Sequence, residues 1–166
     1  MKIYADKLAR NLKEGIKPIY VVSGDEPLLV QEACDSIRGT LRQRGYTERD
    51  LFHVDGSFDW QQLLYSAGSM SLFAEKKIIE LRMPTGKPGD KGAKALKSYV
   101  ENIPEQTVLL IIAGKLERAT QSSKWFKALD SVGASVQVWP IAVNQLPAWL
   151  NDRIRQASMS ASREAV

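Results

Sequence analysis

The pattern that most constrains this chain is a repeated switch between short apolar runs and longer helical periodicity. The apolar runs at 19–22, 51–55, 77–82, 108–113 and 135–138 are too short for helices and fit strands. Between them, apolar residues recur at spacings of three and four, as on one face of a helix. Strands that alternate with helices need crossover connections. We therefore predict a three-layer α/β fold with a mainly parallel, five-stranded sheet.

Local signals mark where several of these helices begin and end. A first helix, with Tyr4 and Leu8 on its apolar face, stops at Gly15. Pro27 stands where the first turn of the next helix would be, and Asp59 can cap a third helix. The loop 83–92 carries two prolines and three glycines, so we expect the following helix only from about Ala93.

The composition narrows the class of site. The single cysteine, Cys34, cannot form an internal disulfide, and the charged first 15 residues lack a signal sequence, so we expect a cytoplasmic protein. One cysteine and one histidine cannot build the usual zinc sites, which need three or four such ligands. His53 fits a buried or edge-strand histidine better than a catalytic one. The longest apolar stretch, Val108 to Ala113, is far shorter than the ~20 residues of a membrane span.

The turn after the first apolar strand is where a protein of this class binds phosphate. Here it reads VVSGDEPLLV, in which Gly24 is followed by Asp25 and Glu26 and not by the Gly-Lys-Ser/Thr of a phosphate-binding loop. Two acidic side chains would repel a phosphate. No dinucleotide fingerprint occurs elsewhere, and no acid pair ends the apolar strands. We expect no cofactor, neither nucleotide nor metal.

Two kinds of surface feature remain. Met70, Leu72 and Phe73 lie in a short connector, SMSLFAEKK, and either fold back into the core or form an exposed hydrophobic plug for a partner's pocket. Basic clusters around Arg38 and Lys94 are typical of solvated helix faces. The 23 Lys and Arg against 19 Asp and Glu leave a net charge of +4, which is weak for a dedicated nucleic-acid binder.

Two other classes of function stay open at this point. One is a metal-dependent α/β hydrolase or transferase that uses the strand-end carboxylates Asp25, Glu26 and Asp55. The other is a nucleic-acid-binding module, whose affinity would fall steeply with salt.

Four stretches together resemble a known family. They are GDEPLLVQEACDSIR, MSLFAEKKIIELRMP, VLLIIAGKLERATQSSKWFKAL and QLPAWLNDRIRQ, and with the N-terminal segment they extend the likeness over the whole chain. The family is that of the delta subunits of bacterial DNA polymerase III clamp loaders. The resemblance implies a degenerate AAA+, P-loop-NTPase-like domain over residues 1–140, with an exit helix and the start of a truncated helical lid domain at 141–166. It also implies that the chain is an N-terminal fragment, in keeping with the helix-start signals of the tail SMSASREAV.

The resemblance further implies a contact site. In the family, a hydrophobic plug inserts into a pocket of the ring-shaped sliding clamp and opens the ring for loading on primed DNA. The Lys76 and Lys77 side chains would add electrostatic support towards an acidic clamp surface. The implied clamp-binding residues are Met70, Ser71, Leu72 and Phe73.

The implied partners are those of DNA replication. They are the sliding clamp, or beta subunit, and the other loader subunits, gamma or tau and delta prime, mostly through domains beyond this chain. DNA contact within the assembled complex stays open. ATP would bind to other subunits, so the resemblance implies a subunit of the DNA polymerase III holoenzyme, grouped with DNA-directed DNA polymerases and nucleotidyltransferases, without catalysis of its own.

Overall fold

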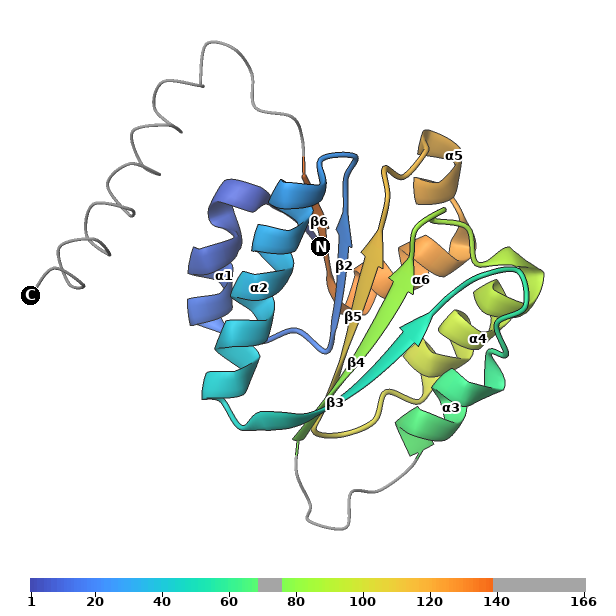
Figure 1. The fold of residues 1–166 in the computed structure, drawn as a ribbon, viewed down its shortest axis with the longest axis horizontal. Helices are drawn as coiled ribbons and strands as arrows, with labels where there is room; N and C mark the ends of the chain where they lie inside the picture. Colours follow the sequence, from blue (N-terminus) through green and yellow to red (C-terminus); the bar gives the residue numbers. More distant parts are fainter. Residues whose placement is uncertain (69–75, 139–166) are drawn as a thin grey trace, which may run out of the picture.

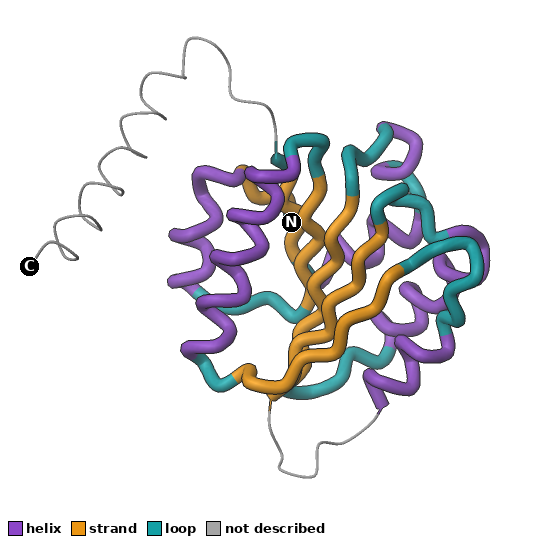
Figure 2. Tube along the Cα trace, in the orientation of Figure 1, coloured by secondary structure: helices purple, strands orange, loops and turns teal. Residues whose placement is uncertain are grey.

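A six-stranded parallel sheet between two helical layers is the framework of the computed structural model, which describes residues 1–68 and 76–138 (Figures 1 and 2). The strand order is β1-β6-β2-β5-β4-β3, and every neighbouring pair is parallel. The strands are β1 (Lys2–Tyr4), β2 (Ile19–Ser23), β3 (Tyr46–His53), β4 (Lys76–Met83), β5 (Thr107–Ala113) and β6 (Ala134–Gln137). The helices are the 3-10 helix η1 (Ala5–Lys7), α1 (Leu8–Glu14), α2 (Pro27–Gln43), α3 (Gln61–Gly68), α4 (Gly89–Glu101), α5 (Arg118–Gln121) and α6 (Lys124–Val132).

Both faces of the sheet are covered, which explains its continuous apolar strands. Helices α1 and α2 pack on one face, and α3, α4 and α6 pack on the other (Figure 1). In β4, Ile78 belongs to the core beneath α1 and α2, whereas its neighbour Ile79 belongs to the opposite core. Consecutive side chains of a strand point to opposite faces, so a strand covered on both sides needs an apolar run and not an alternating pattern. The predicted α/β class is confirmed.

The expected number of strands was wrong by one, because the N-terminus adds β1. We expected Tyr4 on the first helix, but Tyr4 is 56% exposed and Ile3 is buried in the core. Strand β1 pairs with β6, and the N-terminal ammonium lies 2.8 Å from the Asp130 carboxylate at the end of α6. Three residues are too few for a strand period to be told from a helical one.

The local helix signals are confirmed at three positions. Gly15 follows the last residue of α1, and Pro27 is the first residue of α2. The Asp59 carboxylate accepts a hydrogen bond of 3.0 Å from the Gln61 backbone N–H at the start of α3. Gly15, Pro27 and the Asp59 side chain satisfy the geometry of helix ends through local contacts.

Helix α4 begins four residues earlier than expected, at Gly89. Gly92 lies inside the helix and is buried against the Trp60 ring, where a Cβ atom would lie 2.5 Å from the nearest ring carbon. This close packing explains a glycine inside a helix, where its intrinsic propensity is poor. Among the described helices, none is long and apolar enough to cross a membrane.

Candidate functional site

The connector between α3 and β4 is the first candidate site. The predicted clamp-binding residues Met70, Ser71, Leu72 and Phe73 lie outside the described residues, so their choice between core and surface stays a prediction. The structure does describe the two elements that bracket them. Helix α3 is anchored by Leu63, which is fully buried, and β4 begins at Lys76 beside the edge strand β3.

A buried lysine ties these two bracketing elements together. The Lys77 side chain donates a hydrogen bond of 2.6 Å to the Ser66 carbonyl oxygen in α3 and lies 3.3 Å from the Asp50 carboxylate in β3. The Ser66 hydroxyl also donates to Asp50. Since a buried ammonium without partners is costly, this set of contacts fixes the end of α3 against the start of β4 and the middle of β3. We call Lys77, Ser66 and Asp50 the lysine tie.

The lysine tie corrects one sequence expectation. We expected Lys77 to offer charge at the surface, but its side chain is only 7% exposed and its ammonium is used inside the molecule. Lys76, one residue earlier, is only partly buried. Its ammonium donates to the Arg44 carbonyl oxygen at 3.1 Å and lies 5.3 Å from the centre of the Tyr46 ring. Of the two lysines, only Lys76 is placed to present charge next to the connector.

The second candidate is a pocket at the carboxyl ends of the central strands. Its volume is about 70 Å³, well below the ~300 Å³ or more of a typical ligand site. The Gln137 side-chain amide donates to the Gln121 carbonyl at 2.7 Å, and Gln121 donates to the Leu116 backbone carbonyl at 3.1 Å. A Cβ atom on Gly24 would lie 2.7 Å from the Val138 carbonyl oxygen, so this turn is packed tightly against the end of β6. The pocket is lined by Ser23, Gly24, Asp25, Lys115, Leu116, Gln121, Gln137 and Val138.

The carboxylates considered for a metal-dependent enzyme do not converge. Asp25 and Glu26 follow β2, whereas Asp55 follows β3, and the sheet places β5 and β4 between those strands. Three strand spacings amount to ~14 Å. The Asp55 carboxylate instead accepts hydrogen bonds from the Ser57 hydroxyl (2.8 Å) and backbone N–H (2.9 Å), which lower its pKa. Within residues 1–68 and 76–138, no group of three His, Cys, Asp or Glu side chains could hold a metal ion.

The two lone residues of reactive type are placed apart from both candidate sites. His53 is exposed at the end of the edge strand β3, as one of the two predicted alternatives had it. Cys34 is buried in α2, and burial raises the pKa of its thiol to about 12. A thiol with such a pKa stays protonated at neutral pH and is a poor nucleophile.

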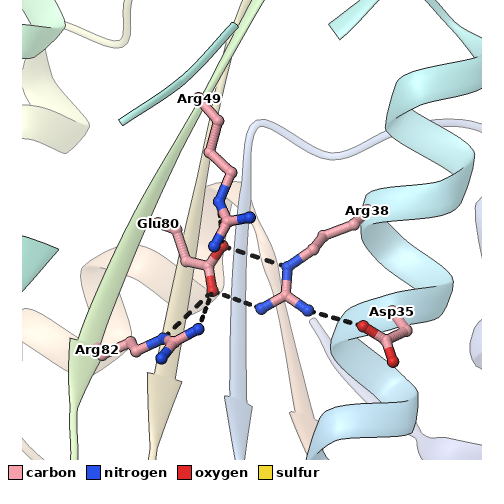
Figure 3. Close-up of polar contacts among 5 residues, drawn as sticks. All are labelled: Asp35, Arg38, Arg49, Glu80 and Arg82. Atoms are coloured by element: carbon pink, nitrogen blue, oxygen red, sulfur yellow. Dashed lines mark hydrogen bonds and ion pairs between the residues drawn. The ribbon is translucent and has the colours of Figure 1, made fainter. Parts of the chain in front are cut away.

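A buried carboxylate with three arginines is the polar cluster that the sequence reasoning missed (Figure 3). Glu80 of β4 is fully buried, and Arg38 of α2 binds it through two nitrogens, one of them at 3.2 Å. The side chains of Arg49 and Arg82 add ion pairs of 2.9 and 3.5 Å. Arg38 also pairs with Asp35 at 2.8 Å. We call these five residues the Glu80 cluster; one signal for it was a glutamate in the middle of the apolar run KKIIELRM.

The cluster keeps Glu80 ionised. Burial on its own would raise the pKa of the Glu80 carboxyl, but the hydrogen bond from Arg38 and the charges of Arg38, Arg49 and Arg82 outweigh it and lower the pKa. The expectation that Arg38 belongs to a solvated helix face was wrong, since its side chain is 13% exposed. The cluster joins α2, β3 and β4 by charge-assisted hydrogen bonds.

The fold defines the class of protein, a three-layer α/β domain with a parallel sheet. The Bacillus subtilis DNA clamp loader delta protein superposes with a TM-score of 0.63 at 21% identity, over 80% of this chain and 42% of that one. A DNA polymerase III gamma subunit-related protein from Thermotoga maritima superposes with a TM-score of 0.52 at 13% identity, over 84% of this chain and 47% of that one. Likeness at such low identity shows the fold alone.

The family follows from sequence. The family model of the DNA polymerase III delta subunit matches residues 20–138, and the chain belongs to that family. It is 28% identical over 159 residues to the DNA polymerase III subunit delta of Escherichia coli, covering 96% of this chain and 46% of that protein. It is 26% identical over 168 residues to the same subunit of Haemophilus influenzae, covering 99% of this chain and 48% of that protein. The chain therefore spans about half the length of these relatives.

Proposed function

We propose that this chain is the clamp-binding domain of a clamp-loader delta subunit. Its connector would insert a hydrophobic plug, Met70 to Phe73, into a pocket of the sliding clamp and open the ring for loading on primed DNA. The observation that carries the proposal is the membership of residues 20–138 in the delta subunit family. The lysine tie supports the place of the plug, because it joins the two elements that flank the connector.

The proposed plug has enough apolar surface to act as an anchor. Burying a Leu or a Phe side chain is worth ~1.5–3 kcal/mol, so the pair Leu72 and Phe73 would contribute ~3–6 kcal/mol before the costs of association. Anchoring alone does not open a ring. A binder shifts the equilibrium between closed and open clamp only by its difference in affinity for the two states. The surface next to the plug, including Lys76, would therefore have to fit the open ring better than the closed one.

The rest of the loader would supply ATP binding and control. The small strand-end pocket, with its paired glutamine amides and neighbouring acidic side chains, supports a role for this domain that works by contact. Its partners would be the sliding clamp and the gamma or tau and delta prime subunits of the loader. ATP binding by those subunits would decide when delta is exposed to the clamp.

The test is clamp binding by a plug variant of this chain. We expect Leu72→Ala with Phe73→Ala to abolish co-elution with the purified cognate clamp in size exclusion, and to leave the thermal unfolding midpoint unchanged. A matched control is Tyr4→Ala with Leu28→Ala, which removes two side chains that are 56% and 50% exposed elsewhere on the molecule. The control should bind like the parent chain.

Two results would contradict the proposal. If the plug variant still co-eluted with the clamp, the clamp contact would have to lie elsewhere on the molecule. If the plug variant unfolded, we would conclude that Leu72 and Phe73 belong to the hydrophobic core.

A further inference from the structure

One strip of the sheet is left open beside helix α2. Arg49, Leu51 and His53 are all exposed and alternate along the edge strand β3, so they lie on the same side of it. That side is the one on which Arg49 reaches Glu80, beyond the flank of α2 (Figure 3). In the register of the two strands, His53 lies opposite Arg82 of β4. We call Arg49, Leu51, His53 and Arg82 the open strip.

The two arginines of the open strip keep hydrogen-bond donors for a ligand. Arg49 contacts Glu80 through Nε at 2.9 Å, and Arg82 contacts it through Nε and one terminal nitrogen, each at 3.5 Å, while their side chains are 44% and 42% exposed. A guanidinium group has five N–H donors, and Glu80 oxygens occupy only part of this set in either arginine. Around Glu80, three guanidinium groups face two carboxylates, those of Glu80 and Asp35, so the cluster carries a net charge of +1.

Glu80 gives these guanidinium groups a fixed geometry. Arginine side chains lose much rotamer freedom when they bind a ligand, and a buried carboxylate that already holds them removes part of that cost. Arg49 pairs in register with Ile78, and Arg82 lies four residues further along β4. The two backbone positions are therefore ~13 Å apart along the sheet, but both guanidinium groups contact the one Glu80 carboxylate, so their charged ends lie close together.

We infer that the open strip binds phosphate groups of a nucleic-acid backbone. Guanidinium groups match phosphate oxygens with paired donors, and two of them held side by side on one carboxylate can reach neighbouring phosphates of one strand, whose charges follow every ~3.4 Å of helix axis. An acidic protein partner fits less well, because protein interfaces have an apolar centre, and Leu51 is the one exposed large apolar side chain of the strip. The choice of DNA as the nucleic acid rests on the proposed function, whereas the phosphate-binding site is inferred from the geometry of the arginines.

The test uses the 166-residue chain with fluorescent DNA oligonucleotides, single-stranded and duplex, over a series of salt concentrations. For Arg49→Gln with Arg82→Gln we expect about a tenfold loss of affinity at low salt. The slope of log affinity against log salt should flatten by ~1.8 for duplex or ~1.4 for single strands, the change for two lost phosphate contacts. The matched control is Lys94→Gln with Lys97→Gln, which removes two exposed positive charges from α4 on the opposite face of the sheet. The control should keep the slope.

A charge-preserving variant separates the site from the fold. Arg49→Lys with Arg82→Lys should retain the parent slope, because it keeps both charges and loses only the paired donors. Should the double glutamine variant prove unfolded by circular dichroism, Arg49→Gln alone leaves Arg38 and Arg82 on Glu80 and should flatten the slope by about half as much.

Three outcomes would overturn the inference. They are an unchanged slope in the arginine variant, an equal loss in the lysine control, and equal or tighter binding of a poly-glutamate peptide to the same arginines. Clamp co-elution is measured in parallel. The arginine variant should still bind the clamp, and the plug variant should still bind DNA, so failure of one proposal is told from failure of the other.

Discussion

The two ends of the parallel sheet differ in what they are built to hold. At the carboxyl ends of β2, β5 and β6, where ligands of α/β proteins usually bind, the structure has a pocket of only about 70 Å³ crossed by glutamine amides. At the opposite end, where β4 begins, the lysine tie anchors the two elements that bracket the connector. The end of the sheet where ligands usually bind therefore has only a small pocket, which we call the closed end. The opposite end is held by the lysine tie, and we call it the braced end.

Under the proposed function, this contrast explains how a parallel α/β domain could act through contact with a partner. A turn that carries two acids gains nothing from a phosphate, so tight packing of Gly24 against β6 costs no function there. A peptide segment that has to enter a partner's pocket gains from rigid supports, since order already present in the free protein need not be created on binding. Strand β4 belongs to the braced end and also carries Glu80 at its centre.

The largest effect we predict concerns this shared strand. Glu80→Gln leaves Arg38, Arg49 and Arg82 around a neutral amide and should lower the free energy of unfolding by about 3 kcal/mol, the low end for a broken buried ion pair because two of the arginines are partly exposed. Urea unfolding measures it. The control is Glu14→Gln, whose ion pair with Arg10 is exposed, and it should cost less than ~0.5 kcal/mol. Equal losses in the two variants would mean that Glu80 does not brace the sheet.

The same substitution predicts a change in acid stability. Because the pKa of Glu80 is lower in the folded protein than its ordinary value of 4.5, the unfolded chain binds more protons as the pH falls below that value. The stability from Glu80 is therefore complete above pH 4.5 and is lost as the pH falls through the folded pKa. Unfolding free energies measured from pH 6 down to pH 3 should decline less steeply in Glu80→Gln than in the parent chain, and Glu14→Gln should follow the parent. A parallel decline in all three would contradict the low pKa.

Much of this architecture could be predicted from the sequence, because it depends on local signals. The alternation of apolar runs with helical spacing predicts the α/β layers, and Gly15, Pro27 and Asp59 predict three helix ends. These features depend on neighbours within one or two turns. The strand β1 escaped prediction because its pairing partner, β6, lies more than 130 residues away.

The polar clusters could not be predicted for the same physical reason. Arg38 and Glu80 are 42 residues apart, and only the packing of α2 on β4 brings them together. Lys77 stands beside Lys76 in the sequence, but neighbouring residues of a strand point to opposite faces, so Lys77 becomes buried and Lys76 only partly so. For the candidate site, family resemblance supplied the plug residues, and the structure supplied what holds their flanks.

The second-largest predicted effect is a loss of stability on removing the lysine tie at the braced end of the sheet. Lys77→Met keeps the length of the side chain and removes the donor to Ser66 and the partner of Asp50, so we expect a loss of about 2 kcal/mol in the free energy of unfolding. Clamp affinity should also fall several-fold, because the supports of the connector loosen. The control is Lys97→Met, an exposed lysine on α4. A variant that loses stability but binds the clamp as tightly as the parent would show that bracing and clamp binding are independent.

The smallest effect is expected at the closed end. Thermal unfolding in ~1 mM ATP with magnesium should give the same midpoint as without ligand, within about 0.5 °C, because the pocket is too small for a nucleotide and Asp25 lines it. The experiment is sensitive: a ligand present at 100 times its Kd stabilises by ~2.7 kcal/mol, which moves the midpoint of a domain of this size by ~5–10 °C. Magnesium alone serves as the control for salt effects. A rise of several degrees with ATP would reopen the strand-end pocket as a binding site and remove the contrast between the two ends of the sheet.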